Sequence, residues 1–242
     1  MDEDHLRKIE HAIDSLPDNF SILEEQIDVK LQMKYFKYVK DKRNNEPIED
    51  FSLVEQQLDS PEQTPEQKRI LLVRLAGSDK VDAFRVIERF QKKSRGNLRK
   101  WATLALQESR MVLHSFLLGE QQIFISTGLG GKGQNIRYFI AMIKKDRTEF
   151  SETQQKIVKS EFGYFLNDNN GELENIKFEN EFALGLFLFP LKKSLNGIFH
   201  SFIDECNQYG NFLHENVIIT NVKILTIDEV KNFIYNGKQS LI

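Results

Sequence analysis

Hydrophobic and polar positions along the chain follow two different periods, and the change between them falls near Gly119. Before Gly119, apolar residues recur every three or four positions, which is the spacing of helices with one buried face. After it, segments with a period of two are mixed with further helical segments. The pattern predicts an all-α N-terminal half and a C-terminal half that combines strands and helices.

The clearest helical pattern covers residues 97–119. Six of its apolar residues fall on one stripe and are predicted to be buried: Leu98, Trp101, Ala102, Ala105, Val112 and Phe116. The two alanines keep the middle of the stripe thin, so another helix can approach closely. Gly119 is a typical residue for the position just after a helix. This helix is predicted to join the two halves.

The N-terminal half is predicted to contain five more helices. They cover residues 4–16, 21–39, 52–58, 64–76 and 81–93. Ser21 with Glu24, and Ser52 with Glu55, have the spacing of a capping box, in which each side chain binds the other residue's free amide. Thr64 is followed by a proline and, three residues on, by a glutamine, which is a further signal for the start of a helix.

The segment from about Thr64 to Leu118 contains long helices joined by a few turn residues, and the last of them opens with the sequence LRKWATLAL. This segment resembles HEAT-type repeats, particularly the short bacterial kind, in which an arginine lies just inside the second helix and small residues follow. Arg99, Ala102 and Ala105 occupy those positions. The resemblance implies an α-solenoid whose inner face binds a partner, usually a protein and sometimes a nucleic acid.

The C-terminal half is predicted to alternate strands and helices. Strands are expected over residues 122–127, 136–143, 172–179, 182–189 and 217–225, and helices over 151–165, 194–209 and 226–233. From Ile136 onward the order is that of a ferredoxin-like sandwich, and residues 122–127 would add a strand to it. We therefore predict an α+β protein of two domains, a helical HEAT-like array over residues 1–119 and a ferredoxin-like domain over residues 120–242.

Composition adds information about the compartment. The single cysteine, Cys206, excludes an internal disulfide and a Cys-rich zinc cluster, and it suits a reducing environment. The first twenty residues are rich in acidic side chains and lack the apolar core of a signal peptide. The longest apolar run, over residues 182–191, is too short to span a membrane. We expect a cytoplasmic protein.

The net charge of −3 is unevenly distributed. Residues 1–63 hold 16 acidic and 8 basic side chains (net −8), residues 64–118 hold 5 and 12 (net +7), and residues 119–242 hold 15 and 13 (net −2). Seven basic residues could form one ridge: Arg85, Arg89, Lys92, Lys93, Arg95, Arg99 and Lys100. Such a ridge can bind phosphates or an acidic protein. It can equally pair with the acidic helices that precede it.

A second candidate site is the glycine-rich stretch GLGGKG. Its candidate residues are Gly128, Gly130, Gly131, Lys132 and Gly133, because closely spaced glycines before a lysine can surround an anion with backbone amides. A Walker loop, however, needs serine or threonine after the Gly-Lys pair and then a helix, whereas here a glycine and a predicted strand follow. A plain hairpin connection is favoured, and a weak anion site is the alternative.

The remaining polar residues predict no catalytic or metal centre. The five histidines lack the spacing of metal ligands. His200 and Asp204 would share a helix face, but no nucleophile motif accompanies them. We predict a non-enzymatic protein-interaction or scaffold protein without a cofactor. The alternatives are a nucleic-acid-binding protein that uses the basic ridge, and an anion or small-molecule sensor at residues 128–133.

Overall fold

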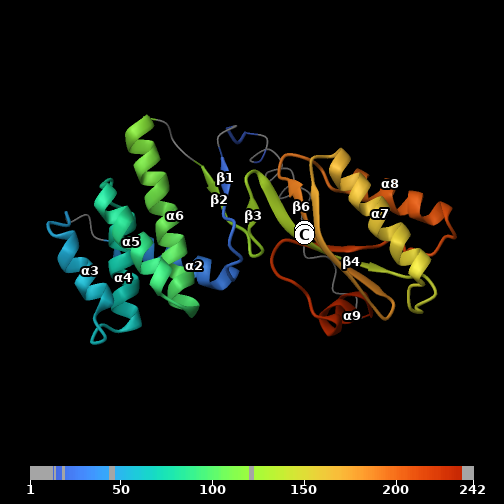
Figure 1. Cartoon of the computed structure of the whole chain (residues 1–242), viewed down its shortest axis with the longest axis horizontal. Helices are drawn as coiled ribbons and strands as arrows, with labels where there is room; N and C mark the ends of the chain where they lie inside the picture. Colours follow the sequence, from blue (N-terminus) through green and yellow to red (C-terminus); the bar gives the residue numbers. More distant parts are fainter. Residues whose placement is uncertain (1–12, 14, 18–19, 44–46, 120–122, 236–242) are drawn as a thin grey trace. The chain divides into compact units, whose positions relative to one another are not determined.

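The computed structural model describes residues 13, 15–17, 20–43, 47–119 and 123–235, and it divides into two compact units. One unit is helical and covers residues 27–124; the other combines residues 1–26 with residues 125–242 (Figure 1). The expected mixture of N-terminal helices and a C-terminal sheet with helices is therefore confirmed. The boundaries differ from the predicted ranges 1–119 and 120–242, because the segment up to Gln26 groups with the sheet unit.

Five helices are found in the described residues of the helical unit. They are α2 (Val29–Lys42), α3 (Phe51–Asp59), α4 (Pro65–Ala76), α5 (Val81–Lys93) and α6 (Gly96–Leu118). The cap predicted at Thr64 is confirmed, since its side chain and that of Gln67 form a complete capping box. The caps predicted at Ser21 and Ser52 are wrong. Asp28 and Asp50 cap α2 and α3 instead, each accepting two backbone amides of the first turn.

The middle of α6 is the centre of the helical unit. The side chains of Trp101, Ala102 and Ala105 are fully buried, as predicted, and α4 and α5 both pack against this helix. Phe116 was expected on the same buried stripe, but its side chain is 62% exposed. Figure 1 shows the reason, because the C-terminal turns of α6 continue past the ends of α4 and α5.

The sheet unit is built on an antiparallel sheet. Its strands are β3 (Gly131–Lys132), β4 (Asn135–Ile143), β5 (Glu172–Glu179), β6 (Phe182–Pro190) and β7 (Ile218–Thr220). The order is β3-β4-β6-β5, and β7 pairs with β4 on the same side as β3. The central strands β4 and β6 pair along their whole length, from Asn135 opposite Pro190 to Ile143 opposite Phe182.

Two short strands lie outside this sheet. β1 (Ser21–Ile22) pairs with β2 (Phe124–Ile125) to form a separate two-stranded sheet. The additional strand predicted at residues 122–127 therefore does not join the main sheet. The amide of Leu23 donates to the carbonyl oxygen of Ile125 at 2.9 Å, which directs this segment to β1. The short strand that is added to the main sheet is β3, inside the glycine-rich stretch.

Helices cover both faces of the sheet. α7 (Glu152–Asp168) and α8 (Asn196–Gln208) form a core with one face, in which Phe162, Phe187 and Phe202 are buried. α9 (Ile227–Tyr235) packs on the other face, where Val230 joins a second apolar cluster. The helix predicted at residues 4–16 lies almost entirely outside the described residues.

Candidate interaction surface

The middle of the predicted basic ridge faces the acidic side of α3. The guanidinium of Arg89 donates to both carboxylate oxygens of Glu55 at 2.7 and 2.6 Å, and the ammonium of Lys93 pairs with Asp59. The two basic residues are four positions apart on α5, and the two acidic residues are four positions apart on α3. Two rows of opposite charge therefore meet along the facing helices. These contacts correspond to the interpretation in which the ridge pairs with the acidic residues that precede it.

The Arg89–Glu55 contact affects the titration of both groups. The hydrogen bonds from Arg89, reinforced by its charge, hold the pKa of Glu55 below the ordinary value of 4.5. The same hydrogen bonds raise the pKa of Arg89. A bidentate contact between a guanidinium and a carboxylate fixes geometry as well as charge. This part of the ridge therefore contributes to holding α5 against α3.

The other ridge residues lie nearby on the same helices and the turn between them. Lys92 pairs with Glu88 one turn earlier on α5, at 3.1 Å. Arg85, Arg95 and Arg99 are exposed, and Lys100 is half-buried. The seven predicted residues thus lie on α5, the turn after it and the start of α6, and ion pairs are described for Arg89, Lys92 and Lys93.

The glycine-rich stretch is packed against other backbone. A Cβ atom placed on Gly130, whose φ is +72°, would lie 2.6–2.8 Å from three carbonyl oxygens of residues 23–25. The amides of Leu129 and Gly130 already donate to Asn221 and Thr127. Lys132 is exposed and pairs with Glu172 at 3.2 Å. Carbonyl oxygens repel anions, so this arrangement favours the hairpin interpretation over an anion site.

The sheet unit offers little for catalysis among its described residues. His200 and Asp204 are both exposed on α8. The thiol of Cys206 is fully buried, and burial raises its pKa to about 12, which makes it a poor nucleophile. Within the described ranges, no group of three or more His, Cys, Asp and Glu side chains is placed to hold a metal ion.

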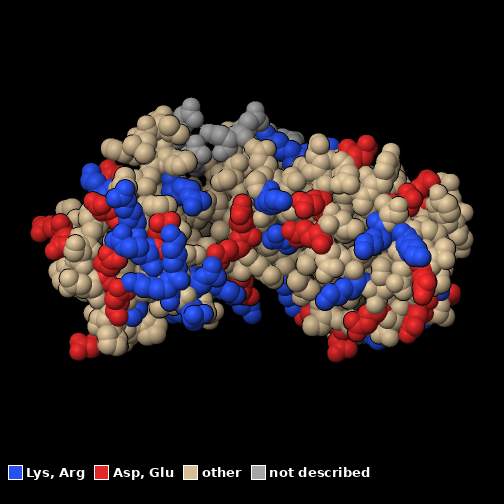
Figure 2. Space-filling view, in the orientation of Figure 1, with Lys and Arg blue, Asp and Glu red and all other residues tan. Residues whose placement is uncertain are grey.

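A surface that the sequence analysis missed lies on the outward side of α2. This helix holds five lysines and one aspartate among its 14 residues. Four of the lysines and one methionine share its outward side, and we call them the α2 lysine face: Lys30, Met33, Lys34, Lys37 and Lys40. Figure 2 shows a different basic area, where Lys and Arg side chains gather over α5 and α6, with Asp and Glu among them; α2 runs behind these helices in the same orientation.

These lysines differ from the ridge in their surroundings. All four are exposed, and within the described part of the chain none of them has a carboxylate partner. The ammonium of Lys34 lies 5.5 Å from the ring centroid of Tyr38, which is a cation–π contact. Met33 is 67% exposed, and Phe36, at the edge of the face, is 55% exposed. The face therefore combines lysines that form no described ion pair with exposed apolar surface.

The inward side of α2 is firmly attached to α6. The Tyr35 ring is buried edge-on against Trp101, with 5.2 Å between ring centroids, and its hydroxyl donates to Glu108 at 2.5 Å. Burial, followed by the charge of Glu108, raises the pKa of Tyr35 well above its usual value. Arg43 pairs with the same carboxylate at 2.8 Å. The lysines are thus presented on a supported helix.

A scan of protein-family models and a search of curated proteins both find no match to this chain. None of the helices described combines the length and apolar character needed to span a membrane.

Proposed function

We propose that this protein is a non-enzymatic interaction protein and that its helical unit binds another protein. One observation carries the proposal: exposed large hydrophobic side chains concentrate in the helical unit. Among the residues that the structure describes, seven of the eleven such side chains lie there, namely Met33, Phe36, Leu53, Val81, Phe116, Leu117 and Leu118. Apolar side chains that gather in one exposed area are typical of surfaces that a protein partner covers, and Phe116, Leu117 and Leu118 are consecutive at the end of α6.

The architecture that we propose agrees with this role. A HEAT-like stack in the helical unit is supported by the pairwise packing of α4 and α5 against α6. A ferredoxin-like arrangement in the sheet unit is supported by the strand order β5-β6-β4-β7 and by α7 and α8 on one face. Fold class alone does not define an activity, so the function rests on the exposed side chains.

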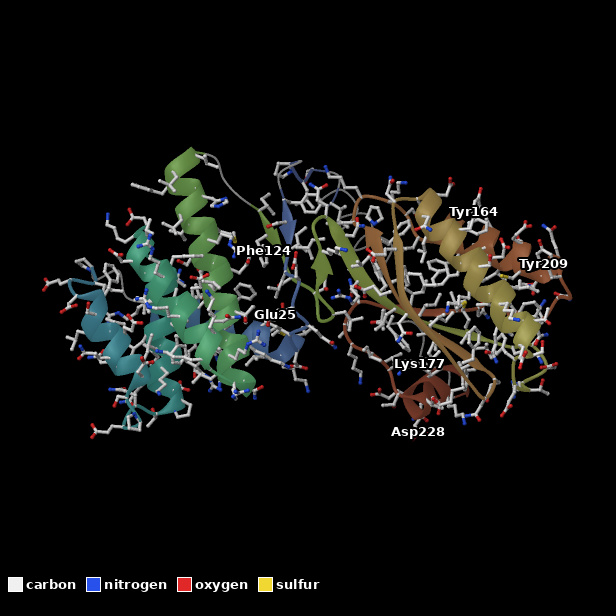
Figure 3. The ribbon with its side chains drawn as sticks, viewed as in Figure 1. Glu25, Phe124, Tyr164, Lys177, Tyr209 and Asp228 are labelled. Carbon is white, nitrogen blue, oxygen red and sulfur yellow. The ribbon has the colours of Figure 1, made fainter. Side chains whose placement is uncertain are left out.

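The proposal is tested by affinity purification of the tagged full chain from its native cell, with nuclease treatment and quantitative mass spectrometry. The variant Met33→Ser, Phe36→Ser removes exposed apolar surface from α2. The control variant Tyr164→Ser, Tyr209→Ser removes side chains of similar exposure, 66% and 59%, from the sheet unit (Figure 3).

We expect nuclease-resistant partners that are captured by the wild type and by the control, and lost from the α2 variant. Capture that is the same for both variants would count against the helical unit as the binding surface. Capture that disappears after nuclease treatment would favour nucleic-acid binding instead. In that case the affinity for nucleic acid should fall steeply as the salt concentration rises. The logarithm of the binding constant against the logarithm of the salt concentration should have a slope of about −0.9 for each phosphate contacted in a duplex, or about −0.7 in a single strand.

A further inference from the structure

The α2 lysine face has a regular geometry. Lys30, Lys34 and Lys37 follow the spacing i, i+4, i+7, and Lys40 extends the row by another turn. At a rise of about 1.5 Å per residue, the row is roughly 15 Å long. Met33 lies among these lysines on the outward side. The face therefore presents a line of positive charges with one apolar contact point.

Lysines at these spacings repel one another. Like charges three or four residues apart destabilise a helix, and within the described residues none of the four lysines forms an ion pair; Asp41, one turn after Lys37, is the single acidic residue of α2. By contrast, Asp28 caps the helix at its N-terminus, and Tyr35 anchors its inward side. The repulsion is thus confined to the outward side, where an acidic ligand would relieve it.

We infer that the α2 lysine face binds an acidic amphipathic helix of a partner protein. This inference rests on the proposed function and adds the chemistry of the partner. A helix with carboxylates at the same i, i+4, i+7 spacing can meet the lysines in register when the two helices pack at about 8–10 Å. A leucine or similar side chain between those carboxylates covers Met33, whose flexible thioether adapts to different apolar shapes.

Two other polyanions fit the surface less well. Phosphates would meet the lysines but leave Met33 and Phe36 exposed, and the face has no arginine for bidentate phosphate contacts. An anionic membrane binds a helix through a broad apolar side. The apolar side of α2 is turned inward, where Tyr35 packs against Trp101. Charge and apolar exposure together favour a protein partner.

The test uses the full chain and a labelled synthetic peptide, measured by fluorescence anisotropy. The peptide is an alanine-based helix that carries glutamates at i, i+4, i+7 and i+11 with leucines between them. A second peptide of the same composition distributes the glutamates around the helix. A short DNA duplex and phosphatidylcholine vesicles that contain phosphatidylserine are the competing polyanions.

The protein variants have matched charge changes. Lys30→Glu, Lys34→Glu, Lys37→Glu reverses the face, and Lys156→Glu, Lys159→Glu, Lys177→Glu reverses three exposed lysines of the sheet unit. We expect the face reversal to weaken binding of the first peptide by at least about tenfold, and the control reversal by less than about twofold. The patterned peptide should bind at least about fivefold more tightly than the other peptide.

The inference would be overturned by equal binding of the two peptides, by tighter binding of DNA or vesicles than of the patterned peptide, or by equal effects of the two reversals. Absence of peptide binding would also overturn it. If partner capture is still lost from the Met33, Phe36 variant, the proposed function survives and only the acidic helix is wrong. If capture is unchanged as well, the proposed function fails too.

Discussion

The basic ridge, on α5 and the start of α6, and the α2 lysine face are both basic surfaces of the same helical unit, but their charges have different surroundings. On α5, Arg89 and Lys93 meet Glu55 and Asp59 across the packed helices. On α2, the lysines have no described carboxylate partner and lie beside exposed apolar side chains. A basic cluster whose charges are paired inside the unit supports the fold, whereas an unpaired cluster is available to a ligand.

The two units of the chain also differ in net charge. The helical unit has 18 Lys and Arg against 14 Asp and Glu, a net charge of +4, whereas the sheet unit has 15 against 22, a net charge of −7. A positive unit attracts acidic partners over distances of about 8–10 Å at physiological salt. The α2 lysine face concentrates that excess on one helix.

The largest expected effect on the free energy of unfolding comes from replacing Trp101, the residue that supports α2. Trp101→Ala removes ring contacts with Tyr35 and Tyr38, at 5.2 and 4.9 Å between centroids, and the hydrogen bond from the indole to the carbonyl of Arg69. Because the side chain is fully buried, we expect the free energy of unfolding to fall by about 3–5 kcal/mol in urea titrations. Trp101→Phe should cost roughly half as much. A loss below about 1 kcal/mol for the alanine variant would contradict a central role for this ring.

A smaller effect separates the two basic surfaces directly. Arg89→Glu, Lys92→Glu, Lys93→Glu breaks three ion pairs and places like charges beside Glu55, Asp59 and Glu88. We expect a loss of about 1–2 kcal/mol in the free energy of unfolding, because each exposed pair contributes less than about 1 kcal/mol and the new repulsions add to that loss.

The reversal of Lys30, Lys34 and Lys37 is the matched comparison. It breaks no described ion pair, so the free energy of unfolding should change by less than about 0.5 kcal/mol. Urea unfolding of both triple variants measures the difference. Equal losses would show that the two surfaces play the same structural role, and the distinction between them would be wrong.

Local signals in the sequence were enough to predict the helix starts at Thr64 and Ser151, and the C-terminal end of α6 at Gly119. In each case the deciding groups lie within a few residues of one another. β6 could also be predicted, because its run of apolar residues is long enough for burial on both faces.

Elements whose hydrogen-bond partners are distant in the sequence could not be predicted from local patterns. Ser21 and Glu24 have the spacing of a capping box, yet the amide of Ile22 donates to Gly133 and that of Leu23 to Ile125. These partners lie more than a hundred positions away in the sequence. A local pattern cannot reveal such competition, so β1 was predicted as helix.

The candidate site was missed for a different reason. The net charge of −8 over residues 1–63 does not reveal that five lysines lie within the 14 residues of α2. The pairing of the ridge had a visible signal, because Glu55 and Asp59 have the same four-residue spacing as Arg89 and Lys93. Only the packing of α3 on α5 shows that the two rows meet.

The pH dependence of stability tests whether the ion pair between Arg89 and Glu55 has a structural role. The pKa of Glu55 is held below its ordinary value of 4.5 in the folded chain, chiefly by the hydrogen bonds from Arg89. The unfolded chain lacks Arg89 at that position, so there the carboxyl titrates near the ordinary value. The stability that the pair adds is fully present above this value and is lost as the pH falls through the folded pKa.

Glu55→Gln should therefore lower the free energy of unfolding by about 0.5–1 kcal/mol at neutral pH, and this loss should shrink as the pH falls through the lowered pKa of Glu55 and disappear once the folded wild-type carboxyl is protonated. Glu62→Gln changes an exposed glutamate shortly after α3 in the sequence and is the control. A double-mutant cycle with Arg89→Gln, measured by urea unfolding at neutral pH and at a pH below the lowered pKa of Glu55, isolates the pair from other carboxyls. A coupling energy that is the same at both pH values would mean that the charge of Glu55 does not hold α3 against α5, and the contrast with the α2 lysine face would then lose its basis.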